Sequence, residues 1–400
     1  MLQKTDVIIV GAGPSGTVAA YRLARAGFSV TTLEAEATCA EDLRASTVHP
    51  PTLEMFDELG IVDDLIAQGL KTPVYHFRDR QSGEFIAFDF DELRDVTPYP
   101  YRLQCEQYKI ARLLAERLEH ECGQPICFSH RVTGVRQTTD EVTVSAISPE
   151  GELELSASFL IAADGGGSVI RKSLQVPFEG LTYPEKFLTF STDTPLDRYF
   201  DDFAYVNYVA DAHEWASIIL TPSGWRVLVP ADGAADDDEL TADTNKNRVF
   251  GNLIGETDAV KTHHRTVYQV NQRVAARYDH GRIALAGDAA HVHNPLGGFG
   301  MNSGIHDVWN ITGKIIKILE TRINGASAFA HYDRQRRTIM QNFVQAQTAV
   351  NKAYMDVGSE AGYREKRKEL ENTAADPQRR RQYLLQQSMI ASRAEEAAIA

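Results

Sequence analysis

Cysteine is scarce in this chain of 400 residues, and the few that occur are not spaced for a metal site or a disulfide framework. The four are Cys39, Cys105, Cys122 and Cys127, and no two of them form a CxxC pair of the kind that structural zinc sites use. We therefore expect reduced, mostly buried thiols, as in cytoplasmic proteins.

Long apolar runs and an excess of basic residues are also missing. No run approaches the roughly 20 apolar residues that a membrane-spanning helix needs, and the N-terminus shows no signal-peptide pattern. We expect a cytoplasmic protein without a membrane span. With 55 acidic residues against 41 Lys and Arg, the net charge of -14 argues against nucleic acid as a partner. The one dense basic stretch, residues 378–382, is interpreted as a solvated helix face.

What the chain does contain is ordinary globular composition, 43% hydrophobic and 24% charged, over a length that suits two or three folding units. Its first 34 residues predict a βαβ unit. An apolar run at 7–10 is typical of a strand buried on both faces of a parallel sheet. Glycines, a helical pattern over 18–26 and a β-branched run over 29–33 follow.

The remaining pattern predicts two interleaved domains and a helical C-terminal region, an α/β class with mixed α+β character. A Rossmann-like domain is assembled from residues 1–73, 102–177 and 272–328, with helices over 52–68, 106–121 and 304–322 and strands over 132–136, 142–147, 158–163 and 283–286. An antiparallel-sheet substrate domain is inserted as residues 74–101 and 178–271, interrupted by an acidic loop at 231–239. Residues 329–400 read as charged helices that cover the domain interface or form a homodimer contact.

A GxGxxG motif lies directly between the first strand and the first helix. Gly11 permits the tight turn, Gly13 lets the backbone approach a pyrophosphate, and Gly16 lets helix and strand pack closely. The phosphates would lie at the positive end of the helix dipole. Glu34 ends the second strand, where a carboxylate can accept both ribose hydroxyls of a dinucleotide. The motif alone does not separate FAD from NAD, although Pro14 and the N-terminal position favour FAD.

Two further motifs point to one family. Residues 161–171 read IAADGGGSVIR, and residues 282–302 read RIALAGDAAHVHNPLGGFGMN. Together with the first motif, in this order and at this spacing over about residues 5 to 340, they resemble the para-hydroxybenzoate hydroxylase family of single-component, class A flavoprotein monooxygenases. One departure is Gly298-Phe299-Gly300, where many members have Gly-Gln-Gly.

The resemblance implies FAD as the cofactor, with NADH or NADPH as a transient co-substrate, since only one GxGxxG is present. Asp288 would accept a hydrogen bond from a ribityl hydroxyl, and the turn before the long helix would face the flavin ring, where the reduced cofactor carries negative charge. Asp164 and Arg171 carry over as residues that serve FAD and the approach of NAD(P)H. The implied cofactor-binding set is Gly11, Gly13, Ser15, Gly16, Glu34, Arg44, Gln104, Asp164, Asp288, Pro295, Gly298, Gly300, Met301 and Asn302.

The implied reaction is hydroxylation of an activated aromatic ring by O2 through a C4a-hydroperoxyflavin. Since that oxidant is a weak electrophile, the substrate is a small phenol or hydroxylated N-heterocycle, with or without a carboxylate, made more nucleophilic by loss of a proton. The protein then excludes water, holds the ring and helps to deprotonate it.

Candidate substrate contacts come from the inserted sheet and the turn near the flavin. They are Tyr205, Tyr208, His213, Trp215, Arg226, His293 and Pro295, of which Tyr205, Tyr208, Arg226, His293 and Pro295 are taken as catalytic. His291 and His293 have the spacing of a metal pair, but His291 belongs to the flavin motif, so no metal is expected.

Two alternatives stay open on the sequence. The first is another flavin oxidation, such as an epoxidation, an oxidative decarboxylation or a reduction. The second is a flavin-binding protein without turnover. Substrate identity, the choice between NADH and NADPH and the catalytic base are not encoded in any motif that we recognise.

Overall fold

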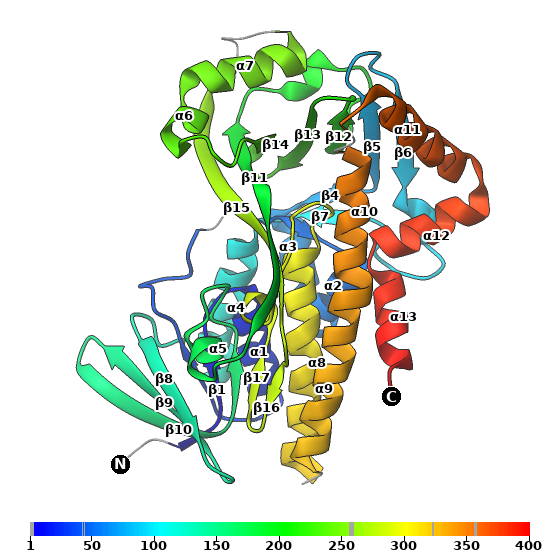
Figure 1. The fold of residues 1–400 in the computed structure, drawn as a ribbon. Coiled ribbons are helices and arrows are strands. Elements are labelled where there is room, and N and C mark those ends of the chain that lie inside the picture. Colours follow the sequence, from blue (N-terminus) through cyan, green and yellow to red (C-terminus); the bar gives the residue numbers. More distant parts are fainter. Residues whose placement is uncertain (1–3, 42, 44, 256–259, 322–323, 356–357) are drawn as a thin grey trace.

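A mixed sheet of seven strands forms the lower half of the molecule (Figure 1). The computed structural model describes residues 4–41, 43, 45–255, 260–321, 324–355 and 358–400. Four strands of this sheet run parallel in the order β17-β10-β1-β2, and three antiparallel strands complete it. The bounds are β1 (Lys4–Val10), β2 (Val30–Leu33), β8 (Arg131–Gln137), β9 (Val142–Ser148), β10 (Gly151–Ala162), β16 (Asp279–His280) and β17 (Ile283–Leu285).

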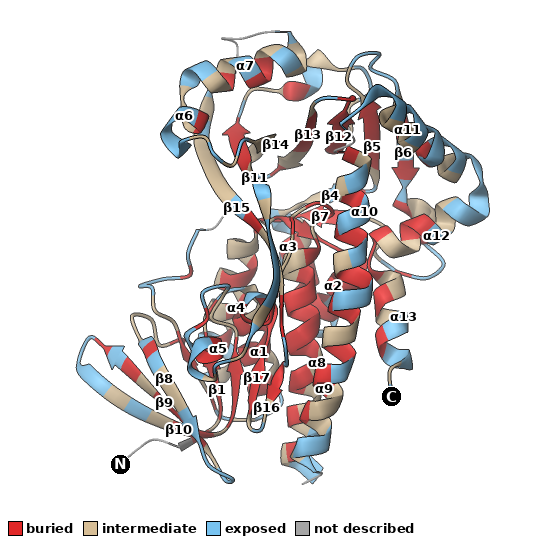
Figure 2. Cartoon of the chain, in the orientation of Figure 1, coloured by how far each residue is buried: buried red, intermediate tan, exposed pale blue. Residues whose placement is uncertain are grey.

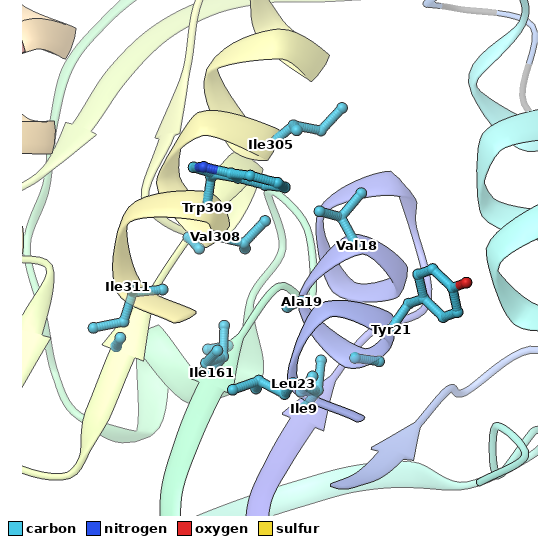
Figure 3. Close-up of a cluster of buried hydrophobic side chains, with 14 of the residues drawn as sticks. Ile9, Val18, Ala19, Tyr21, Leu23, Ile161, Ile305, Val308, Trp309 and Ile311 are labelled. Carbon is cyan, nitrogen blue, oxygen red and sulfur yellow. The ribbon is translucent and has the colours of Figure 1, made fainter. Parts of the chain in front are cut away.

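Helices cover this sheet and close its core. They are α1 (Pro14–Arg25), α4 (Gln107–Cys122), α5 (Val169–Ser173), the short 3-10 turn η3 (Gly287–Ala289) and the long α8 (Phe299–Thr321). Helix α1 packs against both α4 and α8. Figure 3 shows Val18 of α1 and Val308 of α8 among the side chains that meet near Ile9 of β1, and all three are fully buried. The predicted βαβ unit is therefore present, and its apolar run is buried on both faces.

A second sheet of eight strands forms the upper half. Its order is β18-β15-β11-β14-β13-β12-β5-β6, antiparallel except for the β12–β5 pair. The bounds are β5 (Val74–Asp79), β6 (Phe85–Asp89), β11 (Phe178–Thr192), β12 (Val206–Ala210), β13 (Trp215–Thr221), β14 (Gly224–Ala231), β15 (Thr262–Ala275) and β18 (His291–Val292), with 3-10 turns η1 (Phe90–Leu93) and η2 (Leu196–Tyr199). Strands from three separate stretches of chain, 74–89, 178–275 and 291–292, thus form one sheet.

The acidic stretch was expected to be a loop, but part of it is helical. Helices α6 (Asp237–Thr241) and α7 (Asp243–Ile254) follow β14. The Asp236 side chain accepts a hydrogen bond from the backbone N–H of Asp238 and caps α6. Val249 and Phe250 of α7 are buried against the sheet. The acidic residues therefore start α6, and the apolar side of the following helix, α7, covers the sheet.

A small three-stranded sheet lies between the two halves. It consists of β3 (Thr47–Val48), β7 (Arg102–Gln104) and β4 (Leu70–Thr72). Two helices, α2 (Pro50–Glu58) and α3 (Val62–Gln68), stand where one was predicted. The break falls at Gly60, whose φ of +69° lies in the left-handed region.

The C-terminal helices extend along both halves. Helix α9 (Gly325–Ile339) continues through a π-helical segment (η4, Met340–Val344) into α10 (Gln345–Met355), and the three run from the lower sheet to the upper one (Figure 1). Three more follow, α11 (Glu360–Ala375), α12 (Pro377–Gln387) and α13 (Ile390–Ala398). Figure 2 shows exposed residues on α11 and burial concentrated in α8 and the strands.

The basic stretch on α12 was interpreted as solvated, but two of its arginines make specific contacts. Arg380 donates to Glu92 Oε1 at 2.7 Å, and Arg381 donates to Glu92 O at 2.6 Å and Asp95 Oδ2 at 2.7 Å. These bonds fasten α12 to η1 and the residues after it. Within the described part of the chain, no helix has both the length and the hydropathy to cross a membrane.

Candidate active site

Two adjoining cavities lie at the carboxyl ends of the parallel strands. The first, of about 630 Å³, is lined by residues at the ends of β1, β2 and β10 and by α4. The second, of about 640 Å³, extends from there to the eight-stranded sheet. Gly13, Pro14 and Gln107 line both, so the two form one continuous site. This is the edge of an open α/β sheet where ligands bind.

The glycine-rich turn shapes the first cavity. Gly11 has a φ of +99°, and a Cβ there would lie 2.3 Å from the carbonyl oxygen of Ala163. At Gly16 a Cβ would lie 1.9 Å from the oxygen of Gly11, so only glycine allows β1 and α1 to approach this closely. At Gly13 the same position meets nothing within 4 Å, because this residue faces the cavity. Helix α1 starts without a side-chain cap, which leaves first-turn N–H groups for a phosphate.

Glu34 lies at the end of β2 and lines the first cavity. One carboxylate oxygen accepts the N–H of Ala12 at 2.7 Å, and the other accepts the N–H of Glu36 at 2.9 Å. These bonds fix the carboxylate against the glycine turn. Each oxygen keeps a lone pair that can accept a ribose hydroxyl.

Asp164 lines the first cavity, but its carboxylate also organises the local backbone. It accepts hydrogen bonds from Ser168 Oγ at 2.6 Å and from the N–H of Ile170 at 3.2 Å, at the start of α5. Burial raises the pKa of this carboxyl above its ordinary value, against the opposing effect of these bonds. Arg171 donates to Gly166 O at 2.7 Å and to Ala289 O at 2.8 Å. It therefore connects the second motif, residues 161–171, to the third motif, residues 282–302.

The third motif supplies the floor of the second cavity. Asp288 is exposed between the buried Gly287 and Ala289 and lines the cavity wall. Gly297 and Gly298 have φ values of +103° and +71°, and a Cβ on Gly298 would lie 2.8 Å from Thr47 Cβ. Only glycine therefore fits these two positions, and the turn packs closely against Thr47 of β3.

Most of the predicted flavin-facing residues lie on this wall, and one does not. Ser15, Pro295, Gly298, Gly300 and Met301 line the second cavity. The exception is Asn302, whose side chain is fully buried behind the turn. Its Oδ1 accepts the N–H of His49 at 2.9 Å, and its Nδ2 donates to Thr47 O at 2.8 Å and Gly298 O at 2.7 Å. Asn302 therefore holds β3 and the glycine turn together.

Gln104 is a second residue whose side chain lies outside the cavities. Its side chain is buried against β3, where its Oε1 accepts the hydroxyl of Thr47 at 3.0 Å, and it lines neither cavity. Gln107, in the first turn of α4, lines both. A sequence signal was present, since Gln107 lies three positions after Gln104 and within the first turn of the helix expected over 106–121. Ser46 lines the second cavity, and the predicted Arg44 lies outside the described residues.

Only some of the substrate candidates line the second cavity. Tyr208, Arg226 and His293 line the second cavity. Tyr205 does not, and its side chain is 43% exposed, because it alternates with Val206 and Tyr208, which face the cavity. Trp215 is core, packed edge-on against Phe187, and the exposed His213 lies 3.9 Å from Glu360.

His293 is the most informative of these side chains. Its Nδ1 lies 2.9 Å from the carbonyl oxygen of Asn294, so Nδ1 carries the proton and Nε2 has a free lone pair. Nε2 is buried and has no hydrogen-bond partner among the described residues. Burial lowers the pKa of His293 to about 4. The ring is therefore neutral near pH 7 and can accept a proton or a hydrogen bond.

A buried charge cluster supports the third motif from behind. Asp307 Oδ2 accepts from His291 Nε2 at 2.7 Å and from the N–H of Gly287 at 3.0 Å, and its Oδ1 accepts from Arg336 Nε at 2.7 Å. Arg336 also donates to Glu396 Oε2 at 2.8 Å. His291 is thereby committed to Asp307, and the described residues contain no group of three His, Cys, Asp or Glu that could hold a metal ion.

These features fit FAD across both cavities. The uncapped start of α1 suits the pyrophosphate, Glu34 suits the ribose of the adenosine half, and Asp288 suits the ribityl chain. Gly297 and Gly298 line the cavity beside Pro295, where the isoalloxazine would lie. A Cβ at either position would clash with Phe299 or Thr47 and strain the turn that supports the ring.

Comparison with known proteins agrees with this geometry. Residues 4–347 match the family described as "FAD binding domain". Para-nitrophenol 4-monooxygenase of Pseudomonas sp. (strain WBC-3) is 32% identical over 357 residues, 87% of each chain. 6-Hydroxy-3-succinoylpyridine 3-monooxygenase HspB of Pseudomonas putida is 31% identical over 348 residues, 85% of this chain and 86% of the relative.

Solved structures share the fold along nearly the whole chain. The crystal structure of p-nitrophenol 4-monooxygenase PnpA from Pseudomonas putida DLL-E4 superposes with a TM-score of 0.91 at 27% identity, covering 97% of this chain and 99% of that one. OxyS anhydrotetracycline hydroxylase from Streptomyces rimosus gives a TM-score of 0.80 at 26% identity, covering 96% and 76%. The chain belongs to the FAD-dependent aromatic monooxygenases, with FAD as its cofactor.

Proposed function

We propose that this enzyme hydroxylates a phenol or a hydroxylated N-heterocycle and that His293 accepts the hydrogen bond of the ring hydroxyl. The observation that carries this proposal is the neutral imidazole on the cavity wall, with an unpartnered Nε2 beside the flavin-facing turn. Two relatives point the same way, since one is named for a nitrophenol and another for a hydroxypyridine.

The chain's own residues would hold the substrate and activate it. A hydrogen bond from the ring hydroxyl to Nε2 draws the proton away and makes the ring more electron-rich. Tyr208, stacked on Phe77 with ring centroids 5.0 Å apart, presents a rigid wall for an aromatic ring. Arg226, at the sheet side of the cavity, favours negative charge that develops on the ring oxygen.

The remaining chemistry is the cofactor's. Bound FAD, once reduced by NAD(P)H, supplies the activated oxygen for the ring. The protein's task is to exclude water, and the buried aromatic side chains at the sheet end of the cavity suit it. Pro295 and the glycine turn keep the ring plane close to the cofactor.

The test is NAD(P)H oxidation by the purified yellow enzyme with a panel of phenols and hydroxypyridines, followed by product mass under labelled O2. We expect strong stimulation by one class and one labelled oxygen atom in the product. His293→Gln, which keeps an acceptor, should retain more activity than His293→Phe, and His213→Gln, in the exposed turn between β12 and β13, should match the wild type. Equal activity in all three variants would remove His293 from the mechanism.

Two broader expectations are also proposals. A cytoplasmic location is supported by the requirement for NAD(P)H, which cell fractionation tests. A homodimer contact through the C-terminal helices is supported by the exposed Val350 on α10, and sedimentation velocity measures it.

A further inference from the structure

Arg102 is a buried guanidinium on the wall of the second cavity, and none of the sequence motifs includes it. It is the first residue of β7, in the small sheet between the two halves, and is 1% exposed. Its Cζ lies 4.6 Å from the ring centroid of Tyr75 and 5.0 Å from that of Phe90. Two aromatic faces therefore fix the plane of the guanidinium.

The hydrogen bonds of Arg102 are incomplete. Its Nη2 donates to the backbone oxygen of Gln387, at the end of α12, at 3.1 Å. Its Nε is buried and has no partner, and no carboxylate of the described chain lies within 4 Å of the guanidinium to neutralise it. A buried, unpaired charge is costly, and buried charges are normally paired.

The other buried arginines have the hydrogen-bond acceptors that Arg102 lacks. Arg336 pairs with two carboxylates, those of Asp307 and Glu396. Arg78 donates to three backbone carbonyls, and Arg171 donates to two. Of the four buried arginines in the described chain, Arg102 alone has a single acceptor.

The cavity around Arg102 favours an anion. Among the described residues that line it, the charged ones are Arg102, Arg226 and Asp288, and Asp288 belongs to the third motif, at the flavin end. The end toward the eight-stranded sheet therefore carries two cations and no acid. Such a lining attracts negative charge on a ligand.

We infer that Arg102 binds an anionic oxygen group on the aromatic substrate, such as a ring carboxylate, and so selects anionic over neutral phenols. This inference rests on the proposed function and names the substrate class of the same site. A guanidinium matches a carboxylate with two parallel N–H···O bonds. The tether to Gln387 also makes α12 part of the support for this group.

The test uses the FAD-loaded enzyme and matched ligand pairs, 3- and 4-hydroxybenzoate against their neutral amides. Dissociation constants come from the change in flavin absorbance, a readout that needs no turnover. We expect the wild type to bind the anion of at least one pair ten or more times more tightly than its amide. Arg102→Met should weaken the binding of that anion about 10- to 100-fold and the binding of its amide less than about threefold. This is the loss expected for one charge-assisted hydrogen-bonded pair.

Two variants separate binding from folding. Arg102→Lys keeps the charge, so it should keep FAD and an intermediate preference for the anion. Arg80→Met removes a cation that pairs with Asp211 outside this cavity, and it should leave the preference unchanged.

Equal binding of acid and amide in the wild type would overturn the inference, as would failure of every anion to bind. If Arg102→Met weakens the binding of the acid and of its amide equally, Arg102 has a structural role only. Failure of the proposed function has a different signature, in which anions bind with the expected preference but no phenol stimulates NAD(P)H oxidation.

Discussion

Replacing Asp307 with asparagine tests how far the buried charge cluster holds the flavin motif in place. The carboxylate receives three donors, from Arg336 Nε, His291 Nε2 and the N–H of Gly287. Asparagine has one acceptor oxygen and one amide group that donates. Its amide group would therefore face at least one of these N–H donors, and that donor would lose its acceptor. Arg336 and Asp307 are both fully buried, so water cannot substitute for the lost acceptor.

The expected magnitude follows from the remaining bonds. Breaking one side of a buried ion pair costs about 3–5 kcal/mol. Since Arg336 keeps Glu396 as a partner at 2.8 Å, we expect the lower end, a loss of about 3 kcal/mol in the free energy of unfolding. FAD affinity should fall as well, because Gly287 precedes Asp288 on the cavity wall.

The assay is urea unfolding of the holoenzyme at pH 7, with FAD content measured on the same samples. Glu154→Gln, which removes an exposed ion pair with Arg136 on the β8–β10 hairpins, is the control and should leave the unfolding midpoint unchanged. A loss below about 1 kcal/mol for Asp307→Asn, with normal FAD content, would refute the reasoning, since that is the range of an ordinary surface change.

The same cluster predicts a pH dependence. Burial alone would raise the pKa of Asp307, but the charges of His291 and Arg336 hold the pKa below its ordinary value of 3.8. A carboxyl with a lowered pKa contributes its full stabilisation above the unfolded pKa and loses it as the pH falls through the folded one. The wild type should therefore lose stability below about pH 4 more steeply than Asp307→Asn.

Three further changes have outcomes that the structure fixes. Gly298→Ala places a Cβ 2.8 Å from Thr47 at a φ of +71°, so it should lower the free energy of unfolding by about 1–3 kcal/mol and release FAD. Gly313→Ala, where a Cβ meets nothing nearer than 3.6 Å, should retain FAD. Fluorescence titration with FAD compares the two variants, and equal affinities would contradict the predicted clash. Burial raises the pKa of Cys105 to about 12, so iodoacetamide at pH 8 should label the half-buried Cys127 first, and mass spectrometry would detect the reverse order. Arg381→Ala removes the bonds to Glu92 and Asp95, so limited proteolysis should cut α12 sooner than in the wild type; an unchanged rate would mean that these bonds do not hold the helix.

The parts of the cofactor site that are local in the chain could be predicted from sequence. Gly11, Gly13, Gly16 and Glu34 lie within one βαβ unit, whose short connections leave little freedom for where each residue goes. Asp288 follows a buried strand directly, so its place at the sheet edge was also determined locally. The division into a parallel and an antiparallel sheet followed from the change in hydrophobic pattern between 7–33 and 74–101.

Other residues depend on contacts across long stretches of chain, and for these the sequence was insufficient. Gln104 and Gln107 are both polar and three residues apart, and only the pairing of β7 with β3 decides which one reaches the cavity. Asn302 was predicted to contact FAD, but its partners are Thr47 and His49, more than 250 positions earlier.

Sequence by itself determined the cofactor, the two-sheet architecture and the family, because these rest on motifs whose geometry is set by neighbouring residues. Tertiary structure decided which residues face the cavity, where Tyr208 lines the wall and the exposed Tyr205 does not. It also revealed Arg102, whose burial and single acceptor come from Tyr75, Phe90 and Gln387. Whether a charge is buried and lacks a partner depends on contacts made by the whole fold, and a sequence does not record them.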